Sequence, residues 1–211
     1  AHATDAGGSI RVPAACCGLV GMKPTRGAIP GGPSFGNHLA GIASELAVCR
    51  SVRDTALIFD ELSGNSRGPF ADPSPVDIVN GRLRIGLLID TGAAYPTEGD
   101  RLAAVEDAAR ALGSDRHGIV PLSWAEFESS VAASGRAFAD IVSVNLAALM
   151  KAAALDESRA EPLPQAFAAR GRALSVTSLW NTLNEAVLVS HKLWALFDRI
   201  DCILMPMLSS A

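Results

Sequence analysis

Two short apolar runs, one on each side of an amphipathic segment, constrain the fold of this chain more than any other feature. The run RLRIGLLID predicts a buried strand over 83–89, and HGIVPL predicts a second strand. Thr97 is expected to cap a helix between them. The apolar stripe of that helix consists of Leu102, Val105, Ala109 and Leu112. Strand, helix and strand with short connections form a βαβ unit, which predicts a layered α/β protein.

Helical patterns occupy much of the remaining chain. Ser51, with Asp54 three positions later, forms a capping-box pattern that predicts a helix with Gly64 at its C-terminal turn. One face of this helix is expected to carry Val52, Ala56, Phe59 and Leu62. After the βαβ unit, 123–155 is mostly helical, and PLPQAFAARGRALS predicts a shorter helix.

The longest uninterrupted helical pattern near the end of the chain runs from about 175 to 199 and precedes a last strand in CILM. Its apolar face is expected to carry Val176, Trp180, Leu183, Val187, His191 and Trp194. A histidine on such a face is more typical of a hydrogen-bonded core residue than of a catalytic one, so His191 is expected in the core.

Composition excludes several classes of protein. Hydrophobic residues make up 49% of the 211 positions and charged residues 19%, which is typical of a globular chain with a sizeable core and not of a disordered one. With a formal net charge of −4 and no basic patch, the chain is not expected to bind nucleic acid. No apolar run reaches the length of a membrane span, so no membrane partner is expected.

The four cysteines are not spaced like the ligands of a zinc ion. No C-x-x-C pair occurs, and the adjacent Cys16 and Cys17 are poorly placed to form a bridge with each other. The cysteines therefore predict buried free thiols, no metal site and a cytoplasmic location, where thiols stay reduced.

Residues 5–11, which read Asp-Ala-Gly-Gly-Ser-Ile-Arg, are the segment in which chemistry is most strongly indicated. Consecutive glycines can adopt backbone angles closed to other residues, so that several N–H groups converge on one anion. A serine directly after them could attack the carbonyl carbon whose oxygen these N–H groups receive. A glycine pair before a serine is also typical of a plain turn, and this short segment alone leaves both interpretations open.

The longer string ATDAGGSIRVPAACCGLVGMKPTRG closely resembles the signature of the amidase signature family, whose members hydrolyse or transfer amide acyl groups with a Ser-Ser-Lys triad. The positions that fit the family pattern are Thr4, Asp5, Gly7, Gly8, Ser9, Arg11, Pro13, Ala14, Gly18, Gly21, Lys23, Pro24, Thr25 and Gly27. The segments CRSVRDTALIFDELSG, RLRIGLL and DCILMPMLSSA are similar to later parts of the family. The AHA before Thr4 and the RSVRD segment resemble most the branch that contains 6-aminohexanoate-cyclic-dimer hydrolase.

The resemblance implies the amidase-signature fold, a layered α/β/α arrangement with a mixed central sheet covered by helices. It implies a single domain over 1–211 that is truncated at both ends. Within it, 1–64 would hold the signature core with the nucleophile loop, and 65–211 the remaining α/β part.

The resemblance also implies roles for the loop residues. Ser9 takes the position of the nucleophile that forms the acyl-enzyme. The expected oxyanion hole consists of the backbone N–H groups of Ala6, Gly7, Gly8 and Ser9. Support of the loop is expected from Thr4, Asp5 and Arg11. Lys23 matches a scaffold position and not the catalytic lysine of the family, and neither a cofactor nor a metal is implied.

In the family, the catalytic lysine and the bridging serine both precede the nucleophile by more than the eight residues that precede Ser9 here. A serine without a base is a poor nucleophile. The 211-residue chain is therefore expected to be inactive or nearly so.

Three functions remain open for the protein. The first is an amidase that hydrolyses a carboxamide or a linear or cyclic amide of a small molecule, with a homodimer as a possible assembly. The second is the glutaminase subunit of a tRNA-dependent amidotransferase, which shares the signature. The third is a non-catalytic pseudo-amidase or a truncated product.

Overall fold

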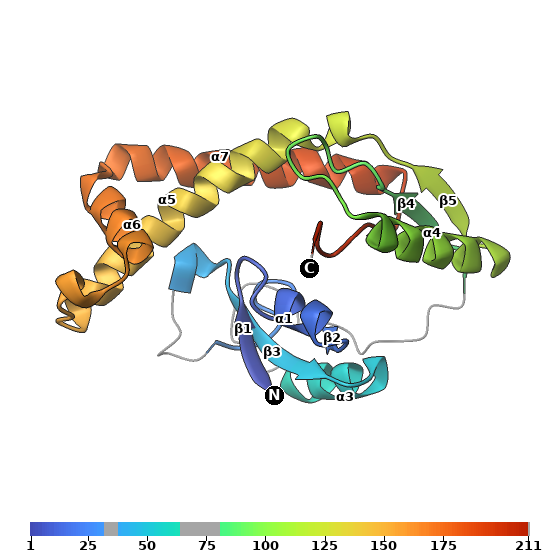
Figure 1. Cartoon of the computed structure of the whole chain (residues 1–211), viewed down its shortest axis with the longest axis horizontal. Helices are drawn as coiled ribbons and strands as arrows, with labels where there is room; N and C mark the ends of the chain where they lie inside the picture. Colours follow the sequence, from blue (N-terminus) through green and yellow to red (C-terminus); the bar gives the residue numbers. More distant parts are fainter. Residues whose placement is uncertain (32–37, 64–80, 211) are drawn as a thin grey trace. The chain divides into compact units, whose positions relative to one another are not determined.

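The computed structural model describes residues 1–31, 38–63 and 81–210 (Figure 1). Contacts within the chain divide it into two compact units, with the boundary between Asn80 and Gly81. The predicted α/β class is confirmed, since helices alternate with strands in both units. That both units belong to a single domain stays a prediction.

The first unit contains a small antiparallel sheet with strand order β1-β3-β2. Its elements are β1 (His2–Asp5), α1 (Arg11–Cys16), β2 (Val20–Gly21), the 3-10 helix η1 (His38–Gly41), β3 (Ser44–Cys49) and α3 (Val52–Leu62). In the register of the sheet, Asp5 at the end of β1 lies opposite Ser44 at the start of β3. The central strand β3 therefore lies beside the loop that follows β1.

The core of the first unit lies among Ile10, Ala28, Leu46 and Phe59. The predicted start of α3 is confirmed, because the Ser51 hydroxyl accepts a hydrogen bond from the Asp54 N–H at 3.1 Å. The predicted apolar face is only partly correct. Phe59 is buried, but Val52 is 73% exposed, while the polar Thr55 faces inward. Gly64 lies outside the described residues.

The second unit contains a parallel sheet with strand order β5-β4-β6. Its elements are β4 (Arg84–Leu87), α4 (Gly99–Ser114), β5 (Gly118–Pro121), η2 (Trp124–Glu126), α5 (Glu128–Ala152), η3 (Glu157–Arg159), α6 (Pro162–Ala173), α7 (Val176–Trp194), η4 (Ala195–Asp198) and β6 (Cys202–Leu204). The predicted βαβ unit is confirmed as β4, α4 and β5. Parallel and antiparallel pairs thus both occur, in two separate sheets of the described residues.

The helix of the βαβ unit begins one residue later than expected. Glu98, and not Thr97, is the residue before α4, and the Thr97 hydroxyl instead forms a hydrogen bond of 2.8 Å with the Thr91 hydroxyl. The predicted inward residues Val105 and Ala109 are buried. The sequence pattern therefore located the helix and its inner face but not its cap.

The start of β4 is bound to the residue before β6 by ionic contacts. The Arg84 guanidinium donates from Nη2 to Asp201 Oδ1 at 2.7 Å, and the Arg84 N–H donates to Asp201 Oδ2 at 2.7 Å. Beside this sheet, Leu88, Leu122 and Ile200 pack together as the centre of an apolar cluster.

Helix α5 packs against both α6 and α7, and Figure 1 shows the long helices α5 (yellow) and α7 (orange-red) crossing each other. The face of α7 that meets α5 carries Thr182, whose hydroxyl donates to Asp140 Oδ2 at 2.9 Å. The predicted apolar face of α7 is instead largely exposed. His191 is exposed as well, so its expected place in the core is wrong.

Of the helices in the described ranges, none combines the length and the apolar character needed to cross a bilayer.

Candidate active site

The glycine-serine segment forms the turn between β1 and α1. Asp5 ends the strand and is completely buried, whereas Gly7 and Ser9 are exposed. Ile10 then places its side chain in the core of the first unit at 0% exposure. A buried residue on each side of the turn therefore holds Ser9 at the surface of the unit.

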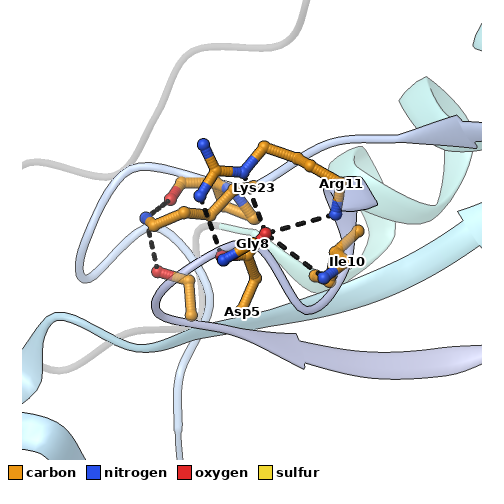
Figure 2. A network of polar contacts seen from close by, with 7 residues as sticks. Asp5, Gly8, Ile10, Arg11 and Lys23 are labelled. Carbon is orange, nitrogen blue, oxygen red and sulfur yellow. Dashed lines mark hydrogen bonds and ion pairs between the residues drawn. The ribbon is translucent and has the colours of Figure 1, made fainter. Parts of the chain in front are cut away.

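Asp5 is the centre of a hydrogen-bond network that shapes this turn (Figure 2). Its Oδ1 accepts from the Gly8 N–H at 2.8 Å, and its Oδ2 accepts from the N–H groups of Ile10 at 3.2 Å and Arg11 at 3.3 Å. The Arg11 guanidinium donates twice, from Nε to Oδ2 and from Nη2 to Oδ1, each at 2.9 Å. One buried carboxylate thus accepts five hydrogen bonds across seven residues of the chain.

The electrostatic consequence is a carboxylate that stays ionised. Burial raises the pKa of the Asp5 carboxyl, but the hydrogen bonds from Arg11, Gly8 and Ile10 together outweigh burial and hold that pKa far below its usual range. The same ion pair raises the pKa of the Arg11 guanidinium. The turn is therefore held by a carboxylate that stays ionised at neutral pH and well below it.

Gly8 is required at the centre of the turn by its backbone conformation. Its φ of +127° lies in the region that favours glycine, and an added Cβ would lie 2.9 Å from the Cγ2 atom of Val12. Its N–H points at Asp5, and its carbonyl accepts from the Val12 N–H at 2.7 Å. Both backbone groups of Gly8 are thus used inside the loop.

The four expected oxyanion donors differ in availability. In the described part of the chain, the N–H groups of Ala6, Gly7 and Ser9 donate to no other residue, but the Gly8 N–H is taken by Asp5. For Gly8 to serve as a donor to a substrate, its N–H would have to leave the carboxylate. The assignment of these groups to an oxyanion hole stays a prediction, and in this structure it is better supported for Ala6, Gly7 and Ser9 than for Gly8.

Thr4, expected to support the loop, contacts the neighbouring strand. Its hydroxyl donates to Glu45 Oε1 at 3.3 Å, and the two residues are opposite each other in the register of β1 and β3. Thr4 therefore stabilises the strand that leads into the turn and does not join the Asp5 network.

Lys23 lies close to the Asp5 network but is not bonded to Ser9. Its Nζ donates to the Pro24 carbonyl at 2.8 Å and to the Ser44 hydroxyl at 3.3 Å (Figure 2). Burial lowers the pKa of the Lys23 ammonium, an effect that the Asp5 charge opposes. These partners agree with a scaffold role, because the ammonium links the segment after β2 to the start of β3.

A small hollow in the second unit was not anticipated from the sequence. It has a volume of about 260 Å³ and is lined in part by Tyr95, Trp124, Met205 and Pro206. The rings of Tyr95 and Trp124 meet edge to face, with centroids 6.2 Å apart. These residues follow the carboxyl ends of β4, β5 and β6, where ligands of parallel sheets commonly bind. The uncharged lining of this hollow would accept a neutral apolar group. The sequence could have indicated the hollow, because its lining residues follow the strands of the sheet.

The cysteines are free in the described residues, as expected, but they are not all buried. Cys49 is buried and Cys202 half-buried, while Cys16 and Cys17 are exposed at the end of α1. No group of three or more metal-ligating side chains in the described ranges is placed to hold an ion.

Comparison with known proteins identifies clear relatives. The profile of the family Amidase matches residues 1–211. The 6-aminohexanoate-cyclic-dimer hydrolase of Pseudomonas sp. (strain NK87) is 38% identical over 130 residues, which are 56% of this chain and 26% of that protein. One subunit of the glutamyl-tRNA(Gln) amidotransferase of Desulfotalea psychrophila is 43% identical over 97 residues, which are 40% of this chain and 19% of that protein.

The fold is shared with one of these relatives. A solved structure of 6-aminohexanoate cyclic dimer hydrolase superposes with a TM-score of 0.83 and 26% identity, and the match covers 94% of this chain and 44% of that one. The chain therefore spans less than half of the length of the proteins that it matches.

Proposed function

The chain belongs to the amidase family, and on this premise we propose that the complete protein hydrolyses a carboxamide of a small molecule with Ser9 as its nucleophile. The Asp5 network is the observation that carries the proposal. Five hydrogen bonds to a buried carboxylate fix the turn, and they leave Ser9 exposed beside N–H groups that no other described residue uses. Such fixed donors need no reorganisation when a charge forms.

The proposed reaction begins with attack of Ser9 Oγ on the amide carbon. The carbonyl oxygen becomes an oxyanion and accepts hydrogen bonds from the N–H groups of Ala6, Gly7 and Ser9, each worth about 2.7–4 kcal/mol in the transition state. The C–N bond then breaks, and the amine leaves with the proton that Ser9 gave up. Water hydrolyses the resulting ester, which releases the carboxylic acid and restores the Ser9 hydroxyl.

The proton acceptor is the part of this mechanism that the described residues do not supply. No lysine or histidine in the described ranges is hydrogen-bonded to Ser9, and the Lys23 ammonium is bound to Pro24 and Ser44. The proposed base is a lysine that acts through a second serine, as the family resemblance implies. Both would come from the part of the amidase fold that the chain does not span.

Labelling with a fluorophosphonate tests the nucleophile. The complete protein is expected to be labelled, and Ser9→Ala is expected to abolish the labelling while the matched surface variant Ser114→Ala retains it. The 211-residue chain alone is expected to stay unlabelled, because an unassisted hydroxyl reacts poorly. Labelling that persists in Ser9→Ala would refute the assignment of the nucleophile.

The similarity to a cyclic-dimer hydrolase supports a linear or cyclic amide as the substrate, whereas the similarity to one component of an amidotransferase supports glutamine. Release of amine from amides of 6-aminohexanoate by the isolated complete protein would favour the first. Release of ammonia from glutamine that depends on partner proteins would favour the second. If the complete protein has neither activity and is not labelled, it is a non-catalytic member of the family.

A further inference from the structure

One face of α7 carries three large apolar side chains in a line, and no other described part of the chain covers them. Trp180 is 65% exposed, Val187 67% and Trp194 78%. They are seven residues apart, and a seven-residue apolar repeat is the pattern by which one helix packs along another. Val176, which is 87% exposed, extends the line toward the start of the helix. We call these four residues the α7 stripe.

The α7 stripe is not needed to attach α7 to its own unit, because α7 binds α5 through other side chains. Thr182 donates to Asp140, Glu185 pairs with Arg136 at 3.0 Å, and the Lys192 ammonium donates to Ser129 at 2.6 Å. At 100° per residue, these contacts lie on the side of the helix opposite the stripe. The most apolar face of α7 therefore points away from the unit that the helix belongs to.

Within the α7 stripe, the two tryptophans are placed symmetrically about Val187. A tryptophan lies seven residues before it and another seven residues after it. We propose that two copies of the protein pair through α7, with the helices antiparallel and a twofold axis at Val187. Each Trp180 then lies across from Trp194 of the other copy, and the two Val187 side chains meet, as a twofold interface requires.

A hollow lies where this pairing would place an indole. It has a volume of about 460 Å³, and its walls include Val187, Trp194, Ala195 and Asp198. Side chains on a helix lean toward its N-terminus. In an antiparallel pair, Trp180 of the second copy therefore leans from the level of Trp194 toward Ala195 and Asp198. The Asp198 carboxylate can accept a hydrogen bond from an indole N–H, which a buried tryptophan requires.

The charges of α7 are compatible with self-association. From Val176 to Ser190 the helix has one charged residue, Glu185, and that residue is paired with Arg136. At the ends of the pair, Asp198 of one copy lies near the start of α7 in the other copy, where a negative charge is favourable. No like charges are brought together along the stripe.

The α7 stripe is also large enough to contribute to a stable interface between two copies. The four indoles of such a pair would bury on the order of 600–1,000 Å². Stable interfaces bury about 1,200–2,000 Å² in total. The indoles would thus supply about half of the area, and the valines and the flanking turns of α7 would add to it. A pairing that buries four tryptophans also matches the usual composition of interface hot spots.

Sedimentation equilibrium on the 211-residue chain and on the complete protein tests the proposal. We expect a dimer in both, and Trp180→Asp or Trp194→Asp should raise its dissociation constant by at least about 30-fold. The matched control is Leu163→Asp on α6, because Leu163 is 67% exposed in the same unit. It should leave the dissociation constant unchanged. Because the charged variants replace exposed residues, far-UV circular dichroism is expected to show an unchanged fold.

Disulfide trapping tests the register. In a Cys16→Ser/Cys17→Ser background, Val187→Cys should form a covalent dimer on mild oxidation. Val176→Cys should not, because its two copies would lie about 33 Å apart along the pair. Cross-linking of Val176→Cys in preference to Val187→Cys would overturn the antiparallel arrangement. A monomer whose tryptophans resist acrylamide quenching would overturn the pairing itself and assign the stripe to another segment of the protein. None of these readouts depends on amidase activity.

Discussion

Arg11 binds both oxygens of the Asp5 carboxylate, with Nε 2.9 Å from Oδ2 and Nη2 2.9 Å from Oδ1. Asp5 is completely buried, while the Arg11 side chain is 38% exposed. The ion pair therefore links the interior of the first unit to its surface. The shape of the turn that carries Ser9 depends on this contact.

Removal of the buried charge is expected to destabilise the first unit. Asp5→Ala leaves Arg11 and three backbone N–H groups without their acceptor. Loss of one partner of a buried pair costs about 3–5 kcal/mol, and we expect about 3 kcal/mol because Arg11 keeps access to water. Urea unfolding followed by circular dichroism measures the change. The exposed α3 variant Glu61→Ala is the control, and an equal loss in both variants would contradict the role of Asp5.

Lowering the pH should remove the stabilisation that the Asp5 carboxylate contributes. The pKa of Asp5 is depressed in the folded state, so its contribution is complete above the pKa of about 3.9 in the unfolded chain and decreases as the pH falls below that value. The contribution of Asp5 to the slope of the unfolding free energy against pH approaches about 1.4 kcal/mol per pH unit. In Asp5→Asn, the contribution of this carboxyl to the pH dependence of the unfolding free energy should be missing. Urea midpoints measured from neutral to acidic pH test this, and identical slopes in both proteins would be the contrary result.

A lysine should not replace Arg11. An ammonium is a point charge and cannot bind both carboxylate oxygens in the planar geometry of a guanidinium. We expect Arg11→Lys to lower the free energy of unfolding by about 1.5 kcal/mol, since one charge-assisted hydrogen bond is lost at a partly exposed site. Arg53→Lys on α3 is a neutral comparison. Wild-type stability in Arg11→Lys would show that the second hydrogen bond contributes little.

Gly171 on α6 and Gly135 on α5 should respond in opposite directions to the same substitution. A Cβ at Gly171 would lie 2.0 Å from the Ser143 carbonyl oxygen, so α5 and α6 must separate to admit it. We expect Gly171→Ala to cost about 1–3 kcal/mol. No atom lies within 4 Å of a Cβ at Gly135, so Gly135→Ala should stabilise the helix by about 0.5–1 kcal/mol. Thermal unfolding distinguishes the two, and a shared sign would contradict the described packing.

Thiol reactivity should divide the cysteines into two pairs. Cys16 and Cys17 are exposed and should react rapidly with Ellman's reagent. Burial, with a further contribution from the Asp201 charge, raises the pKa of the Cys202 thiol, so less of its thiolate is present at mildly alkaline pH. Cys49 is buried. Two fast and two slow thiols are therefore expected, and the buried Cys49 should react at the rate of unfolding. Four equal rates would be inconsistent with this structure.

The elements that the sequence predicted well are those with local causes. The cap of α3 follows from two residues, Ser51 and Asp54, that form their hydrogen bond within one turn of helix. The βαβ unit follows from strand and helix patterns that adjoin each other over 83–121. In both cases the interacting groups are neighbours in the chain, so a short window of sequence contains the information.

The features that the sequence did not predict depend on which parts of the chain pack against a given helix face or backbone group. Periodicity correctly grouped Trp180, Val187 and Trp194 on one face of α7, but it cannot say whether that face points inward. It placed His191 in the core for the same reason, and His191 is exposed. The use of the Gly8 N–H by Asp5 depends on the path of the turn in three dimensions. The signature string identified the loop but not which of its donors were already occupied.

The order of the strands in the second unit has a consequence for synthesis of the chain. The central strand β4 pairs with β5, made soon afterwards, and with β6, whose neighbour Asp201 follows Arg84 by 117 residues. Over that interval one edge of β4 has no partner, and an open edge can pair with another chain. Pairing between such distant segments is also slow. A nascent chain on the ribosome therefore carries an open edge of β4 until β6 has been translated.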